Sequence, residues 1–113
     1  MEVVKLPTPR RGEVWLTKLD PTVGNEIQKT RPCLVVSPDL MNVALGTVIV
    51  MPMTSGSHPE PFRLRSRFDQ TEGLLLGDQI RSASKQRFIR RLGNVSEPAL
   101  FEALGVLRDM FEE

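Results

Sequence analysis

The sequence predicts a mainly β protein with α-helices: a strongly bent sheet or small barrel with short helical connections, closed by one C-terminal α-helix. Short runs of β-branched or alternating apolar residues follow one another along most of the chain, separated by turns that contain Gly and Pro. The last segment instead repeats its apolar residues at helical spacing. Several short strands followed by one helix favour a small barrel over a βαβ fold. Because 113 residues fit one small core, we expect a single domain spanning residues 1–113.

The first half of the chain predicts three strands. "RRGEVWLTKL" (10–19) offers two apolar faces, and "PCLVVS" (32–37) and "TVIVMPMT" (47–54) are continuous apolar runs of the kind that form buried strands. Between the first two lies the polar segment "DPTVGNEIQKTR" (20–31), which is long for a connection and typical of a binding loop. "PDLMNVALG" (38–46) predicts a turn or a short helix.

The second half predicts a loop at "SGSHPEP" (55–61), three more strands and the terminal helix. "FRLRSRF" (62–68) alternates strictly, so a strand would send its Phe and Leu side chains inward and its three arginines outward. "LLLGDQIRS" (74–82) predicts one strand, and "KQRFIRRLGNV" (85–95) predicts a basic turn with a last short strand. Ser96 can cap the helix. Its apolar stripe would consist of Leu100, Ala103, Leu104, Leu107, Met110 and Phe111.

The charges are unevenly distributed along a chain whose net charge is +1. Between residues 63 and 91 there are three acidic residues and eight basic ones, which are Arg63, Arg65, Arg67, Arg81, Lys85, Arg87, Arg90 and Arg91. The segment from Glu97 onward is acidic. This distribution would give the protein one positive face that attracts phosphates, although ordinary solvated charges produce the same pattern.

Cysteine and histidine are too few to predict a metal site. Cys33 is the only cysteine, which excludes an intrachain disulfide, and its place in "CLVVS" is typical of a buried thiol. His58 is the only histidine. Because zinc needs three or four such ligands, we expect no metal and no cofactor.

No apolar run is long enough to cross a membrane and the N-terminus lacks signal-peptide features, so we expect a cytoplasmic protein without a membrane partner.

Polar residues end or interrupt the predicted strands at Arg31, Thr54, Ser55, Asp78, Gln79 and Arg81. A polar group buried without a partner costs about 1–3 kcal/mol. These residues therefore either satisfy one another or face a site. A structural ion pair of Asp78 with an arginine and a functional role for Asp78 both fit this pattern.

The blocks "RRGEVWLTKLDPTVGNEIQKTRPCLVVSPD", "VIVMPMTS" and "LLLGDQIRSASKQR" resemble the successive signature blocks of the MazF/PemK/Kid toxins, which are mRNA interferases of type II toxin–antitoxin systems. The resemblance covers nearly the whole chain, with the blocks in the family's order. It implies an SH3-like barrel, a homodimer, and sequence-selective, metal-independent cleavage of single-stranded RNA. It also implies a cognate antitoxin whose acidic C-terminal segment occupies the RNA groove.

The resemblance further implies functional residues. Arg31 and Thr54 match residues that line the family's catalytic centre, and Glu26 is our candidate for the general base. The residues that we expect to bind the substrate are Asn25, Lys29, Ser55, Arg63, Arg65, Asp78, Gln79 and Arg81. The chain departs from the pattern where some members carry His, Gln and Arg, at Asn25, Ile27 and Leu76. A mechanism that uses that His or that Arg cannot operate here.

The implied reaction is attack of a 2′-hydroxyl on the adjacent phosphate. The catalyst must help to remove the hydroxyl proton, stabilise charge on the phosphorane and protonate the leaving 5′-oxygen. Arg31 suits the second task because a planar guanidinium can bind two phosphoryl oxygens, whereas arginine side chains keep their proton in proteins and are therefore poor proton donors. Thr54 would hydrogen-bond the phosphate. The expected products carry a 2′,3′-cyclic phosphate and a 5′-hydroxyl.

Two other functions fit the sequence. A protein similar to the CcdB-type gyrase poisons would act by binding another protein, but those toxins act through the terminal helix with a Trp near it, and the only Trp here is Trp15. A small barrel that binds RNA without cutting it would use Arg63, Arg65 and Arg67 as a phosphate track, with strongly salt-dependent binding.

Overall fold

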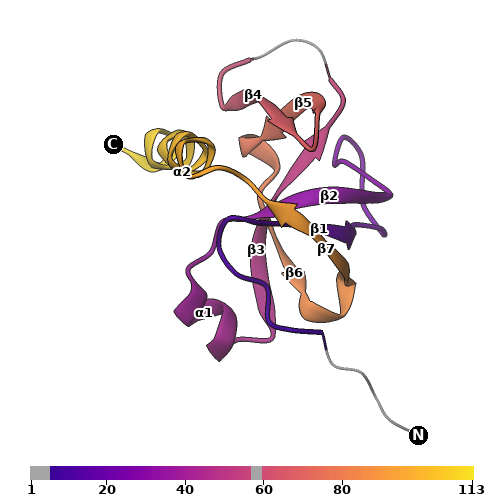
Figure 1. Cartoon of the computed structure of the whole chain (residues 1–113). Coiled ribbons are helices and arrows are strands. Elements are labelled where there is room, and N and C mark those ends of the chain that lie inside the picture. Colours follow the sequence, from indigo (N-terminus) through magenta and orange to yellow (C-terminus); the bar gives the residue numbers. More distant parts are fainter. Residues whose placement is uncertain (1–5, 57–59) are drawn as a thin grey trace, which may run out of the picture.

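The computed structural model describes residues 6–56 and 60–113 as a mainly β structure with one long helix (Figure 1). The described residues form seven strands, two α-helices and two 3-10 turns (η). Their bounds are β1 Glu13–Lys18, β2 Thr30–Val35, α1 Asp39–Ala44, β3 Thr47–Thr54, β4 Arg63–Phe68, β5 Thr71–Leu76, η1 Gly77–Gln79, β6 Arg81–Ser84, η2 Lys85–Arg87, β7 Phe88–Asn94 and α2 Glu97–Phe111. The predicted class, mainly β with a short connecting helix and a C-terminal helix, is confirmed.

The strands form one strongly bent antiparallel sheet in the order β4-β5-β3-β2-β1-β7, with β6 also paired to β3. The start of β3 pairs with β6 and its end, at Met53 and Thr54, pairs with β5. Among the described residues β4 and β7 share no ladder, so hydrogen bonds do not close the sheet into a complete barrel. The Phe68 ring at the end of β4 lies against Gly93 of β7 instead, so closely that a Cβ atom on Gly93 would be 3.2 Å from the ring.

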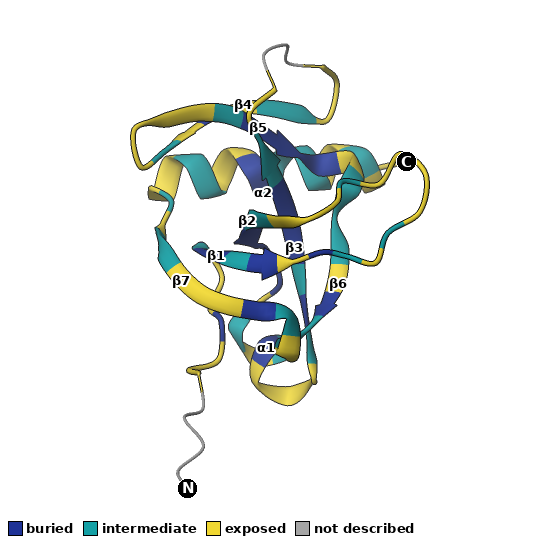
Figure 2. Cartoon of the chain, turned by 90° about the vertical axis from the view of Figure 1, so that its right-hand side faces the viewer, coloured by how far each residue is buried: buried dark blue, intermediate teal, exposed yellow. Residues whose placement is uncertain are grey.

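Apolar side chains bury both faces of the sheet at β1, β2 and β3, whereas β7 is largely exposed (Figure 2). One cluster consists of Trp15, Leu19, Cys33, Val35, Val48, Val50, Ala83 and Phe88. The other consists of Val14, Leu34, Val36, Met51, Leu75 and Ala103, with α2 contributing partly buried leucines. The alternation of neighbouring residues in β1 and β2 between the two clusters explains why both strands read as apolar on two faces.

Helix α2 begins as predicted, because the Ser96 hydroxyl accepts a hydrogen bond from the Ala99 amide at 3.2 Å. Leu104 and Leu107 pack against the second cluster. The predicted apolar stripe is wrong at Phe111, which is 71% exposed, because the end of α2 projects away from the sheet (Figure 1). No helix among the described residues is long and apolar enough to cross a membrane.

The predicted strand over residues 74–82 is wrong as one element. It divides into the end of β5, the turn η1 and the start of β6. The chain turns at Gly77, whose amide donates to the Phe62 carbonyl at 2.9 Å and where a Cβ atom would lie 2.3 Å from that oxygen. Phe62 has a φ of 67° and is 44% exposed, so β4 begins one residue later than predicted and Phe62 does not point inward. Within β4, Arg65 and Arg67 are exposed as predicted.

Cys33 lies in the first cluster with no exposed surface, and burial raises the pKa of its thiol to about 12. The nucleophilic thiolate is therefore almost absent at neutral pH. We expect the native protein to react with Ellman's reagent at pH 8 only as fast as it unfolds, and to react fully in concentrated urea. The absorbance of the released thionitrobenzoate measures this difference. Complete reaction of the folded protein within seconds would contradict it.

Candidate functional site

The structure distributes the predicted site residues over two surface pockets. The first, which we call the Arg31 pocket, has a volume of about 410 Å³ and is lined by Arg31, Pro32, Met53, Thr54, Ser55, Phe68, Asp69, Thr71, Glu72, Gly73, Arg90 and Leu92. The second, the Asp78 pocket, has a volume of about 530 Å³ and is lined by Asn25, Glu26, Ile27, Arg63, Asp78, Gln79, Ile80 and Arg81. Lys29 and Arg65 line neither.

Arg31 is held at the start of β2, opposite Thr17 of β1. The side chain is half-buried, and its Nε donates to the Gln28 carbonyl at 3.2 Å. Its two terminal nitrogens have no acceptor within the described part of the chain. One edge of the guanidinium is thus fixed by the protein, while the terminal nitrogens remain available to a ligand in the pocket.

Thr54 and Ser55 enter the same pocket at the end of β3. The backbone of β5 passes this point so closely that a Cβ atom on Gly73 would lie 2.3 Å from the Thr54 carbonyl oxygen. Thr54 is also paired with Leu74 in the sheet. The close approach of Gly73 and the pairing with Leu74 fix the backbone that carries the Thr54 hydroxyl.

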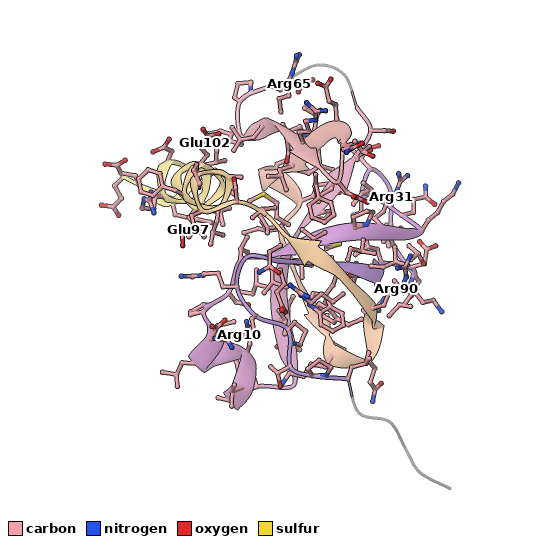
Figure 3. The ribbon with its side chains drawn as sticks, in the orientation of Figure 1. Arg10, Arg31, Arg65, Arg90, Glu97 and Glu102 are labelled. Atoms are coloured by element: carbon pink, nitrogen blue, oxygen red, sulfur yellow. The ribbon has the colours of Figure 1, made fainter. Side chains whose placement is uncertain are left out.

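The Arg31 pocket also contains charged residues that sequence reasoning did not place there. Asp69 and Glu72 come from the β4–β5 hairpin, and Arg90 comes from β7. Figure 3 shows Arg31 and Arg90 on the same side of the molecule. The excess of basic residues between 63 and 91 was the available signal for Arg90, but it does not distinguish Arg90 from the arginines around it.

The Asp78 pocket is organised by hydrogen bonds between the loop after β1 and the turn η1. The Gln79 side chain accepts from the Ile27 amide at 2.6 Å and donates to the Asn25 carbonyl at 3.3 Å. At the other wall, Asp78 receives two bonds of 2.7 Å from Nε and Nη2 of Arg63. Of the two interpretations open for Asp78, the structural pair with an arginine is therefore present.

The Arg63–Asp78 pair makes stability depend on pH. The hydrogen bond from Arg63 holds the pKa of Asp78 below its usual value of 3.8, so the pair stabilises the folded state above that pH, and this contribution is lost as the pH falls through the lowered pKa. Because the Asp78 side chain is 43% exposed, we expect Asp78→Asn to cost only about 0.5–1 kcal/mol at pH 7. Urea unfolding measures this cost. The difference in unfolding free energy between wild type and Asp78→Asn should become small toward pH 2, and a difference that does not change with pH would contradict the stabilising role of the pair.

Glu26 is not brought into the Arg31 pocket. Its carboxylate accepts from the Val23 amide at 2.6 Å, within the loop that carries it, and the residue lines the Asp78 pocket. Lys29 has a φ of 72°, and its amide donates to the Asp20 carboxylate at 3.0 Å across the base of the same loop. The roles of Glu26 as general base and of Lys29 in substrate binding remain predictions.

Two arginines hold the start of this loop. Arg81 donates to the Leu19 carbonyl at 2.9 Å, and Arg87 donates to the Asp20 carbonyl at 2.6 Å and to the Lys18 carbonyl at 3.2 Å. Arg81 therefore has a structural contact in addition to its place in the Asp78 pocket. His58, which falls in the loop predicted over residues 55–61, lies outside the described residues. Over residues 6–56 and 60–113, no group of three or more His, Cys, Asp or Glu residues could hold a metal ion.

Known proteins resemble this chain over nearly its whole length. Residues 10–111 match the family described as PemK-like, MazF-like toxin of type II toxin–antitoxin system. Endoribonuclease PemK of Escherichia coli is 39% identical over 106 residues, covering 86% of this chain and 77% of PemK. Endoribonuclease MazF9 of Mycobacterium tuberculosis is 36% identical, covering 80% of this chain and 86% of MazF9.

Solved structures agree with these sequence matches. The crystal structure of MazF from Deinococcus radiodurans superposes with a TM-score of 0.84 at 27% identity, covering 95% of this chain and 99% of that one. A MazE–MazF complex from the same organism superposes with a TM-score of 0.72, also at 27% identity, covering 95% of this chain and 99% of that one. The resemblance drawn from the three sequence blocks is confirmed. The chain belongs to the PemK-like, MazF-like toxins of type II toxin–antitoxin systems.

Proposed function

We propose that the chain is an endoribonuclease that cleaves single-stranded RNA by attack of a 2′-hydroxyl, with Arg31 and Thr54 as catalytic residues and no metal ion. The observation that carries the proposal is that Arg31 and Thr54 line one open pocket, Arg31 with its terminal nitrogens unpaired among the described residues. Membership of the toxin family and relatives named endoribonucleases support it.

In this proposal, the scissile phosphate lies between Arg31 and the hydroxyls of Thr54 and Ser55. The fixed guanidinium stabilises the charge that accumulates on the phosphorane, without reorganising during the reaction. Arg31 and Thr54 extend from two adjacent strands of one sheet, which keeps their separation constant.

The Asp78 pocket would bind the RNA on one side of the cleaved bond. Gln79 would hold the loop in place there through its bonds to Ile27 and Asn25, while the side-chain amide of Asn25 and Nη2 of Arg81 would bind the exposed edges of unstacked bases. Glu26 would act as the general base only if its carboxylate left the Val23 amide and came within hydrogen-bond distance of the 2′-hydroxyl next to the phosphate in the Arg31 pocket. A shift of the acidic limb of the pH–rate profile in Glu26→Gln would support that role, and an unchanged profile would exclude it.

The test uses a long single-stranded RNA, EDTA and a DNA strand of the same sequence. We expect the RNA to be cut at defined sites, with a 2′,3′-cyclic phosphate on one product and a 5′-hydroxyl on the other, and the DNA to remain intact because it lacks the attacking hydroxyl. Strict dependence on added Mg²⁺, equal cleavage of DNA, or 5′-phosphate ends would refute the proposal. RNA binding without cleavage would instead indicate a non-catalytic barrel.

The partners follow from the same proposal. We infer a homodimer that is inhibited by a cognate antitoxin whose acidic C-terminal segment occupies the RNA-binding surface, as opposite charge favours. The MazE–MazF complex of the similar Deinococcus protein supports an antitoxin partner.

Trp15 does not support the alternative function of a gyrase poison. It is buried in the core and is not beside α2, so it forms no protein-binding surface with that helix.

A further inference from the structure

Arg90 differs from the neighbouring arginines because the fold does not use its charge. Arg87 donates to two backbone carbonyls at the end of β1. Arg91 forms an ion pair of 2.9 Å with Glu13 and a hydrogen bond with Asn94. Arg90 lies between them in the sequence and is exposed, and its side chain has no hydrogen bond or ion pair with any described residue.

The sheet places Arg90 level with the start of β2, the strand that carries Arg31. Arg90 is opposite Leu16 of β1, and Leu16 is opposite Pro32 of β2, the residue that follows Arg31. Adjacent strands are about 4.8 Å apart, so the backbones of Arg90 and Pro32 lie roughly 10 Å from each other across β1. Both arginines line the Arg31 pocket.

The rest of the pocket suits a nucleotide. Thr54 and Ser55 supply hydroxyls, and Pro32, Phe68 and Leu92 supply apolar surface against which a sugar or a base can pack. The carboxylates of Asp69 and Glu72 carry the opposite charge to the two arginines, so a phosphate would have to lie on the arginine side of the pocket.

We infer that Arg90 binds an RNA phosphate next to the scissile one and thereby contributes to substrate binding. The inference rests on the proposed function. Arg31 is half-buried and fixed by the Gln28 carbonyl, whereas Arg90 is exposed and has no protein acceptor among the described residues. A guanidinium that binds a phosphate beside the scissile one contacts the ground state and the transition state equally, so its loss should raise KM and leave kcat nearly unchanged.

The experiment compares wild type with Arg90→Ala, Arg90→Lys and the matched control Arg91→Ala. Cleavage sites are first mapped on a long RNA, and a short RNA around one site is then made with a single 2′-deoxy nucleotide that prevents cleavage. Binding of this RNA is measured at several salt concentrations, and kcat and KM are measured on the cleavable strand. Thermal unfolding of each variant verifies that it is folded.

For Arg90→Ala we expect KM to rise about tenfold, kcat to change less than threefold, and the slope of log affinity against log salt to fall by about 0.7, the value for one phosphate on a single strand. Arg90→Lys should keep the wild-type slope, and Arg91→Ala should keep both the slope and KM. If Arg90→Ala has the slope and KM of wild type, the inference is wrong. It is also wrong if Arg91→Ala lowers the slope equally.

The two proposals fail in different ways. A wild-type protein that neither binds nor cuts RNA refutes the proposed function itself. A wild-type protein that cuts RNA and loses kcat in Arg31→Ala, but is indifferent to Arg90→Ala, refutes only the role of Arg90.

Discussion

Replacing Arg31 by Ala should slow RNA cleavage by a hundred-fold or more, equivalent to about 3 kcal/mol of transition-state stabilisation. The reason is that Arg31 lines the pocket that Thr54 also lines, and its two terminal nitrogens have no acceptor among the described residues. Charge on the phosphorane is greater than on the ground-state phosphate, so the loss should fall mainly on kcat. Single-turnover cleavage in EDTA, with protein in excess over a labelled RNA, measures the chemical step directly.

Two further variants control this measurement. Arg31→Lys keeps the positive charge but loses the planar fork, so we expect a rate between those of wild type and Arg31→Ala. Arg10→Ala removes an arginine of the same charge far from the pocket, where Arg10 pairs with Asp39 beside α1 (Figure 3), and should cut at the wild-type rate. An Arg31→Ala protein that is folded and cuts within threefold of wild type would contradict the assignment.

Gly73→Ala should be among the most destabilising single substitutions in the chain. The added Cβ would lie 2.3 Å from the Thr54 carbonyl oxygen and 3.2 Å from its carbon, and both are backbone atoms that cannot turn aside. Either β3 or β5 must shift, which we expect to cost about 2–3 kcal/mol of unfolding free energy. Because the shift displaces Thr54, the cleavage rate of the remaining folded protein should fall as well.

Gly46→Ala is the matched control for this substitution. A Cβ atom at Gly46 meets nothing within 4 Å, so the change should leave both the unfolding free energy, within about 0.5 kcal/mol, and the cleavage rate unaltered. Urea unfolding followed by the fluorescence of buried Trp15 gives the free energies. Equal stability of the two variants would show that β5 does not press on the end of β3 as described.

Local sequence patterns were enough to predict the features that depend only on neighbouring residues. Period-two alternation gave the exposed Arg65 and Arg67, and Ser96 marked the start of α2. The break at Gly77 could not be predicted, because it depends on the carbonyl of Phe62 approaching from a different part of the chain. The segment "LLLGDQIRS" also does not reveal the strand pairing, in which β5 pairs with the end of β3 and β6 pairs with its start.

The candidate site was likewise only partly predictable from the sequence. Motif resemblance named Arg31, Thr54 and Ser55, and the fold brings these three into one pocket. It did not separate them from Glu26 and Asp78, which belong to a neighbouring pocket, because pocket membership depends on how the loop after β1 folds back onto η1. Arg90 was not singled out because its distinction from Arg87 and Arg91 is the absence of a partner among the described residues, which only coordinates reveal.

The most direct test of the central claim is a crystal structure of the protein with an RNA whose cleavage site carries a 2′-deoxy nucleotide. We expect the scissile phosphate in the Arg31 pocket, with a terminal nitrogen of Arg31 about 2.8 Å from a phosphoryl oxygen and the Thr54 hydroxyl donating to another. A scissile phosphate bound in the Asp78 pocket, with the terminal nitrogens of Arg31 turned onto protein acceptors, would contradict the account.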